Sequence, residues 1–143
     1  MESTSRNQWL GRITSVCYGA ITAEFVVGLE QGGEVAASLT LDAARGLHLE
    51  CGRDVLVLIK APMIMLAVEV EGFAFSARNQ MSGEIVEIRD SASFVDVTMR
   101  LDLGGALTAV MTLESRKELD LAPGKKAVAL FNTASVLLAA RKN

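Results

Sequence analysis

The amino-acid sequence predicts an all-β fold of two tandem five-stranded Greek-key barrels of the oligonucleotide/oligosaccharide-binding (OB) type, each with one short helix. The first observation is an internal repeat, because sliding the chain on itself by 72 positions aligns residues 76–80 with residues 4–8 and Gly104-Gly105 with Gly32-Gly33. The second is that half of the residues are hydrophobic but only 5% are aromatic, so the cores are aliphatic. The third is that each half shows five short strand patterns with one helical turn between the third and the fourth, an order that fits small OB-type barrels.

The repeat divides the 143 residues into two units, residues 1–69 and 70–143. Each unit is near the lower size limit for an independent hydrophobic core. So much aliphatic content leaves more apolar surface than one chain covers, so we expect a homo-oligomer, with a tightly packed two-lobed monomer as the alternative. The connecting residues 69–75 alternate apolar side chains and are not rich in Ser or Pro, which predicts that the two barrels are held in fixed relation.

Five strands and one helix are predicted in the first unit from β-forming runs bounded by turn residues. Gly32-Gly33 supplies a tight turn because glycine accepts positive φ without steric cost. Thr40 stands where a helix N-cap belongs, and Pro62 separates the last two strands. The predicted strands cover residues 10–16, 20–29, 34–39, 55–59 and 63–68, and the helix covers residues 41–47.

The second unit repeats this plan in the same order. Gly104-Gly105 takes the place of the first glycine turn, and Pro123-Gly124 precedes the fourth strand. Its predicted strands cover residues 83–89, 93–101, 107–111, 127–131 and 136–140, and its helix lies within residues 112–119.

Charge and composition exclude several kinds of partner. The net charge is −3 and no block of Lys or Arg is present, which argues against a nucleic-acid surface. Residues 1–4 lack the basic and apolar regions of a secretory signal, and the longest apolar run, residues 55–68, is broken and too short to span a bilayer. Cys17 and Cys51 have no CxxC spacing and suit a reducing compartment. We therefore expect a soluble cytoplasmic protein with no membrane partner.

No catalytic or cation-binding constellation is present in the sequence. His48 is the only histidine and falls in a predicted loop. A single loop histidine argues against a catalytic Ser-His pair and against a histidine-based metal site, and no P-loop or GxGxxG motif occurs. We expect no catalytic residues and no direct cation ligands, and hence a protein that is not an enzyme.

The polar residues that recur are hydrogen-bond donors. Arg78 carries a permanent charge on a donor fork, with Ser76 beside it. Thr112 and Ser115 place hydroxyls at the N-terminus of a short helix, and Lys60 ends the fourth strand of the first unit. Each has an ordinary structural explanation alone, as an ion pair, an N-cap or a solubilising charge. Together they favour a small tetrahedral oxyanion as ligand.

These motifs resemble the molbindin (Mop, or TOBE-type) family, whose members are small cytoplasmic β-barrel proteins that bind molybdate or tungstate. The resemblance rests on Ser76-Ala77-Arg78-Asn79-Gln80-x-x-Gly83, the Leu-x-x-Gly-Gly turn, Thr112-x-x-Ser115 and Pro123-Gly124-Lys125, and it covers nearly the whole chain. It implies that the anion lies at interfaces between barrels, in an assembly that is commonly a trimer of tandem chains.

Carried over residue by residue, the resemblance also implies the oxyanion-binding residues. The two halves differ at two of these positions. Ala43 of the first unit aligns with Ser115 of the second, and Asn132 of the second unit aligns with Lys60 of the first. The candidate residues are Thr4, Ser5, Arg6, Asn7, Thr40, Lys60, Ala61, Pro62, Ser76, Ala77, Arg78, Asn79, Thr112, Ser115, Thr133 and Ser135.

The leading hypothesis is reversible binding of molybdate or tungstate for intracellular storage and homeostasis, without covalent chemistry. The alternative is an oxyanion-sensing regulatory module that acts on a transport or transcription partner. An oligonucleotide-binding barrel would need aromatic stacking residues on a basic face, and the seven aromatic residues are scattered instead. The choice between molybdate and tungstate, the number of intact sites, strand exchange between barrels and subunit number stay open.

Overall fold

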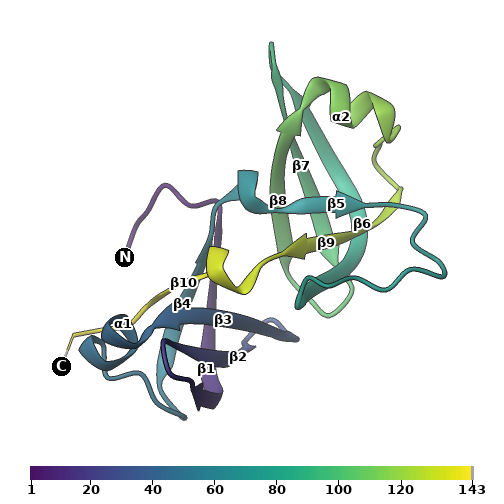
Figure 1. Cartoon of the computed structure of the whole chain (residues 1–143). Helices are drawn as coiled ribbons and strands as arrows, with labels where there is room; N and C mark the ends of the chain where they lie inside the picture. Colours follow the sequence, from purple (N-terminus) through teal and green to yellow (C-terminus); the bar gives the residue numbers. More distant parts are fainter. Residues whose placement is uncertain (143) are drawn as a thin grey trace.

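The structure, a computed structural model, describes residues 1–142 and confirms the all-β prediction (Figure 1). Every element of the first half recurs 72 residues later with matching bounds. The first half contains β1 (Asn7–Tyr18), β2 (Thr22–Leu29), β3 (Glu34–Thr40), α1 (Leu41–Gly46), β4 (Asp54–Ile59), the 3-10 turn η1 (Ala61–Met63) and β5 (Met65–Ala67). The second half contains β6 (Asn79–Asp90), β7 (Phe94–Leu101), β8 (Ala106–Thr112), α2 (Leu113–Glu118), β9 (Lys126–Phe131), the 3-10 turn η2 (Thr133–Ser135) and β10 (Leu137–Ala139).

The two halves exchange their last strands. The first sheet has the order β10-β4-β1-β2-β3 and the second has the order β5-β9-β6-β7-β8. The register pairs Leu137 with Leu58 in the first sheet and Met65 with Leu130 in the second. Neither half therefore contains a complete five-stranded sheet of its own, and the boundary between residues 69 and 70 remains a prediction about the sequence repeat.

Each long first strand is bent so that it serves two neighbours. The N-terminal part of β1 pairs with β4 and its C-terminal part pairs with β2, with a register shift between Ile13 and Ser15. The same shift falls between Ile85 and Glu87 in β6. Such bulges increase the local twist and let a sheet curl toward closure.

The cores are aliphatic, as the composition predicted. Alternate residues of β2 face inward, so that Phe25 and Val27 are fully buried, and Val97 and Met99 take their places in β7. Strand bounds differ from prediction most at the first strand of each half, where β1 begins at Asn7 and β6 at Asn79 instead of residues 10 and 83. Pro62 and its neighbours form the 3-10 turn η1, which shortens β5 from the predicted residues 63–68 to Met65–Ala67. The short helices are capped as predicted, since the Thr40 hydroxyl accepts a hydrogen bond from the Ala43 amide at 3.2 Å.

The two glycine turns meet where the halves join. A methyl group on Gly32 would lie 2.2 Å from the Leu103 carbonyl oxygen, and one on Gly104 would lie 2.0 Å from the Gln31 carbonyl oxygen. Both glycines also have positive φ, 112° and 122°. The Leu-x-x-Gly-Gly motif therefore does more than close a hairpin, because it also lets the two turns approach closely.

Candidate functional site

The predicted donors gather into two clusters because of sheet register. Asn7 pairs with Ile59 between β1 and β4, so the residues before Asn7 lie beside those after Ile59. Asn79 pairs with Phe131 in the same way between β6 and β9. We call Thr4, Ser5, Arg6, Asn7, Lys60, Ala61 and Pro62 the first donor cluster, and Ser76, Ala77, Arg78, Asn79, Thr133 and Ser135 the second donor cluster.

Each cluster lies against the edge strand of the other half. The Asn7 carboxamide donates to the Thr108 carbonyl oxygen and accepts from the Thr108 amide, both at 2.8 Å. The Asn79 carboxamide makes the matching pair with Ala36 in β3, at 2.9 and 2.8 Å. The turn η1 also contacts β8, and η2 contacts β3. Both clusters therefore sit at the junction of the two sheets, where each asparagine covers an otherwise unpaired strand edge.

The asparagine carboxamides are buried and already occupied. Asn7 and Asn79 are 2% and 3% exposed and are the buried polar residues of the described chain. The second amide hydrogen of Asn7 is also used, because its Nδ2 donates to the Ile59 carbonyl oxygen at 3.2 Å. The Asn7 side chain thus has no donor left for an anion. These two residues hold the clusters in place.

The arginine guanidinium groups are paired across the halves. Arg6 lies 2.6 Å from a carboxylate oxygen of Asp96, and Arg78 lies 2.9 Å from a carboxylate oxygen of Glu24. Both arginine side chains are about half exposed, at 49%. Lys60 is also exposed, and among the ion pairs of residues 1–142 none involves it. Its ammonium is the clearest unpaired positive charge in the first donor cluster.

The hydroxyls at the helix N-termini belong to neither cluster. The Thr112 hydroxyl donates to Ser115 Oγ at 3.0 Å and accepts from the Ser115 amide at 3.2 Å. Thr112 lies four residues along β8 from Thr108, which is roughly 13 Å at the rise of an extended strand. Among residues 1–142 no hydrogen bond joins Thr112 or Ser115 to the first donor cluster, or Thr40 to the second, although Arg6 reaches Asp96, whose register partner Val110 lies two residues from Thr112.

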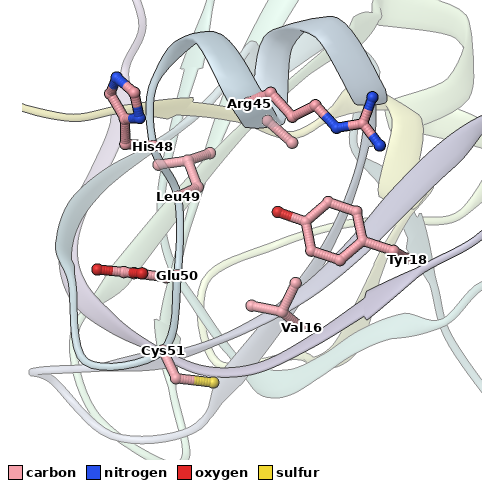
Figure 2. Close-up of a pocket in the computed structure, with 8 residues that line it drawn as sticks. Val16, Tyr18, Arg45, His48, Leu49, Glu50 and Cys51 are labelled. Atoms are coloured by element: carbon pink, nitrogen blue, oxygen red, sulfur yellow. The ribbon is translucent and has the colours of Figure 1, made fainter.

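A separate depression of about 570 Å³ lies beside α1, and its lining includes none of the predicted donors (Figure 2). Its walls combine the opposite charges of Arg45 and Glu50 with apolar side chains, and His48 lies at the end of the helix with a positive φ of 53°. No sequence motif pointed to it, since Tyr18 and Cys51 align with the unlike residues Asp90 and Pro123 in the repeat. The lining residues are Val16, Tyr18, Ala44, Arg45, His48, Leu49, Glu50 and Cys51.

Within residues 1–142, no group of three or more His, Cys, Asp or Glu side chains could hold a metal ion. No helix in the same range is long and apolar enough to cross a membrane. Cys17 and Cys51 are both exposed thiols.

Comparisons with known proteins agree with the repeat. The profile of the TOBE domain matches residues 3–66 and again residues 76–138. The molybdenum transport protein ModE of Azotobacter vinelandii is 37% identical over 139 residues, which make up 97% of this chain and 51% of that protein. The molybdenum-pterin-binding protein MopA of Rhodobacter capsulatus is 36% identical over 141 residues, or 97% of this chain and 52% of that protein.

The chain thus spans about half the length of the curated relatives it matches. A solved structure matches from end to end. The cytoplasmic molybdate-binding protein ModG, with molybdate bound, superposes with a TM-score of 0.93 at 34% identity, covering 99% of this chain and 100% of that one.

Proposed function

This chain belongs to the TOBE-domain family, and from that premise we propose that it binds molybdate or tungstate reversibly in the cytoplasm, for storage and homeostasis of the anion. The observation that carries the proposal is the end-to-end match to a molybdate-bound protein, at a TM-score of 0.93 over 99% of this chain. Its relatives are named as transport, binding and regulatory proteins, and we propose no reaction for this chain.

The chemistry of the clusters suits such an anion. Molybdate and tungstate carry two negative charges and no proton at neutral pH, so a site needs donors and no acceptors. The first donor cluster offers the Lys60 ammonium, which acts as a point charge on a flexible stem. Arg6 lies in the same cluster and adds a second cation. Local charge of this kind attracts the anion although the whole chain carries −3.

We propose that each complete site needs more than one copy of the chain. Within the described chain no hydrogen bond joins the helix hydroxyls to the donor clusters, and a second barrel would complete the site with further donors. The outer face of the first sheet supports association, because Leu10 lies opposite Leu56 and Leu137 opposite Leu58. Leu10 and Leu137 are each 59% exposed. A row of leucines on a sheet face is typical of an interface between subunits, and a homotrimer is the assembly we favour.

Equilibrium dialysis with molybdate, tungstate and sulfate tests the binding. We expect molybdate and tungstate to bind at micromolar concentration and sulfate to bind more weakly, because we propose that a site formed between barrels is sized for the two larger anions. A charge-assisted hydrogen bond contributes about 1.5–3 kcal/mol, so Lys60→Gln should weaken molybdate binding by about tenfold or more. Lys126→Gln, at an exposed lysine outside both clusters, is the matched control.

Two results would remove the proposal: no bound molybdate at micromolar concentration, or equal affinity for sulfate. The assembly is tested separately by analytical ultracentrifugation. A chain that stays monomeric with molybdate present would contradict the shared sites and leave single-chain binding to be judged by the dialysis alone.

The second candidate is a sensing module that acts on a partner. It is supported by the relative from Azotobacter vinelandii, of which the matched region forms only about half. A pull-down from lysate with and without molybdate separates the two functions, since storage requires no partner whose capture depends on the anion.

A further inference from the structure

The α1 depression, the hollow of about 570 Å³ beside α1, lies where the second half of the chain places an arginine side chain. Ala44 in its lining stands 72 residues before Arg116. In the second half the Arg116 Nε donates to the Leu121 carbonyl oxygen at 3.2 Å, and its guanidinium lies 3.4 Å from a carboxylate oxygen of Asp90. Alanine can make neither contact, so the first half lacks the aliphatic stem and the guanidinium group that occupy this place in the second.

The loop that follows each short helix has the same conformation in both halves. The Leu49 amide donates to the Ala44 carbonyl oxygen and the Leu121 amide donates to the Arg116 carbonyl oxygen, both at 3.1 Å. The residue before each leucine has a positive φ, of 53° in the first half and 52° in the second. The Leu49 carbonyl is therefore turned toward the space beyond the Ala44 side chain, as the Leu121 carbonyl is turned toward the side chain of Arg116.

The Leu49 carbonyl oxygen lacks the donor that its counterpart has. Among residues 1–142 no hydrogen bond ends on this oxygen, and the nearby Arg53 guanidinium donates to the carbonyl oxygens of Leu47 and His48 instead. Leu49 is only 2% exposed, so the oxygen lies at the inner wall of the depression. A buried backbone carbonyl is nearly always paired, so this one is an acceptor for a donor that the chain itself does not supply.

The other walls suit an aliphatic stem with a cationic head. Val16 and Leu49 provide apolar contact. Tyr18 stands at the position of Asp90 in the repeat, and Figure 2 shows its hydroxyl pointing toward the middle of the labelled residues. The hydroxyl oxygen can accept a hydrogen bond, and the ring face can lie against a cation. Tyr18 is 51% exposed at the end of β1, so its side chain can turn to admit a ligand to the Leu49 carbonyl.

We propose that the α1 depression binds a free small molecule that carries an alkylguanidinium group. The guanidinium donates to the Leu49 carbonyl oxygen and lies against the Tyr18 ring, while the stem packs on Val16. Arg45 and Glu50 in the lining carry opposite charges and offset each other, so a single cation is not repelled. The volume is within the range of small-molecule sites. This site is additional to the oxyanion function and does not depend on it.

The test uses n-butylguanidinium as the probe and N-butylurea, which has a similar shape and no charge, as the comparison. Amide chemical shifts of the ¹⁵N-labelled full chain are followed during titration. We expect saturable shifts at Leu49, Glu50 and Cys51 with n-butylguanidinium, and binding at least about fivefold weaker with N-butylurea, because hydrogen bonds from a charged donor are stronger. Leu121 should not shift, since Arg116 already fills the equivalent place.

Ala44→Arg combined with Tyr18→Asp copies the arrangement of the second half and should abolish these shifts. Ala44 is fully buried, so Tyr18→Phe, at an exposed position, serves if the double variant fails to fold, and it should weaken probe binding severalfold. Arg116→Ala empties the equivalent place in the second half, so the probe should then also shift Leu121. Molybdate dialysis of the same variants shows whether the oxyanion sites are intact, which separates the two proposals.

Four results would overturn the proposal. They are no saturable shift in the wild type, equal binding of N-butylurea, undiminished binding in the double variant or in Tyr18→Phe, and no added shift at Leu121 in Arg116→Ala.

Discussion

Replacing Asn79 by alanine should destabilise the chain strongly even when no anion is present. The Asn79 carboxamide makes two hydrogen bonds to the backbone of Ala36, and Ala36 is only 7% exposed. Removing the carboxamide leaves one N–H and one C=O of the edge strand without partners. A buried polar group without a partner costs about 1–3 kcal/mol, so two such groups predict a loss of about 2–4 kcal/mol once water enters the gap.

Urea unfolding measures this loss through the midpoint at an unchanged m-value. Asn132→Ala is the matched control, because Asn132 is exposed and its side chain makes no capping hydrogen bond. Hydrogen exchange adds a local readout, since the Ala36 amide should lose protection in Asn79→Ala and the Thr108 amide should not. A loss in Asn79→Ala no larger than in Asn132→Ala would refute the structural role and favour a direct role in anion binding instead.

Three further changes test the junction between the halves. Gly104→Ala should lower the free energy of unfolding in urea by more than about 2 kcal/mol, because the added methyl group would lie 2.0 Å from the Gln31 carbonyl oxygen. A free energy of unfolding equal to that of the wild type would contradict the close contact of the turns. A double-mutant cycle on Arg78 and Glu24 should give a coupling free energy below about 1 kcal/mol that decreases with added salt, because both side chains are about half exposed. A coupling free energy of several kcal/mol would contradict the exposed ion pair seen in the structure. Ending the chain after residue 135 removes β10, so hydrogen exchange should rise in β4 of the first sheet although the deletion lies in the second half; a rise confined to β9 would contradict the strand exchange.

The repeat made most of the fold predictable. Because the alignment at 72 positions has no gap, each signal in one half supports the same signal in the other, and the bounds of all elements recur at that spacing. Local signals were also sufficient for the caps at Thr40 and Thr112, which the structure confirms. Such features depend on a few neighbouring residues, so they can be read from one stretch of sequence.

Strand exchange could not be predicted for a physical reason. The exchanged strands share the same short apolar pattern, with Leu66-Ala67 in one and Leu138-Ala139 in the other. Side-chain pattern sets register by matching apolar faces, and either strand would satisfy β4 or β9 equally well. What selects the partner is the path of the connecting chain, which no local pattern records.

The motif identified candidate donors, but not the residues with which each of them pairs. Asn7 bonds to a residue 101 positions away and Asn79 to one 43 positions away. The carboxylates that pair with Arg6 and Arg78 are just as distant in sequence. Such contacts depend on how the two sheets are placed, so a motif shows which donors are present without showing which are already engaged.

The strength of these existing contacts decides which donors an anion can recruit. An exposed ion pair contributes only about 0–1 kcal/mol, so Arg6 can leave Asp96, and Arg78 can leave Glu24, at little cost. A buried carboxamide bonded to backbone costs several times more to release, so Asn7 and Asn79 stay in place. We infer that anion binding draws on the guanidinium groups, the Lys60 ammonium and the hydroxyls while the asparagines keep the halves together. Since Asn132 replaces this lysine in the second half, the first donor cluster should bind the anion more tightly.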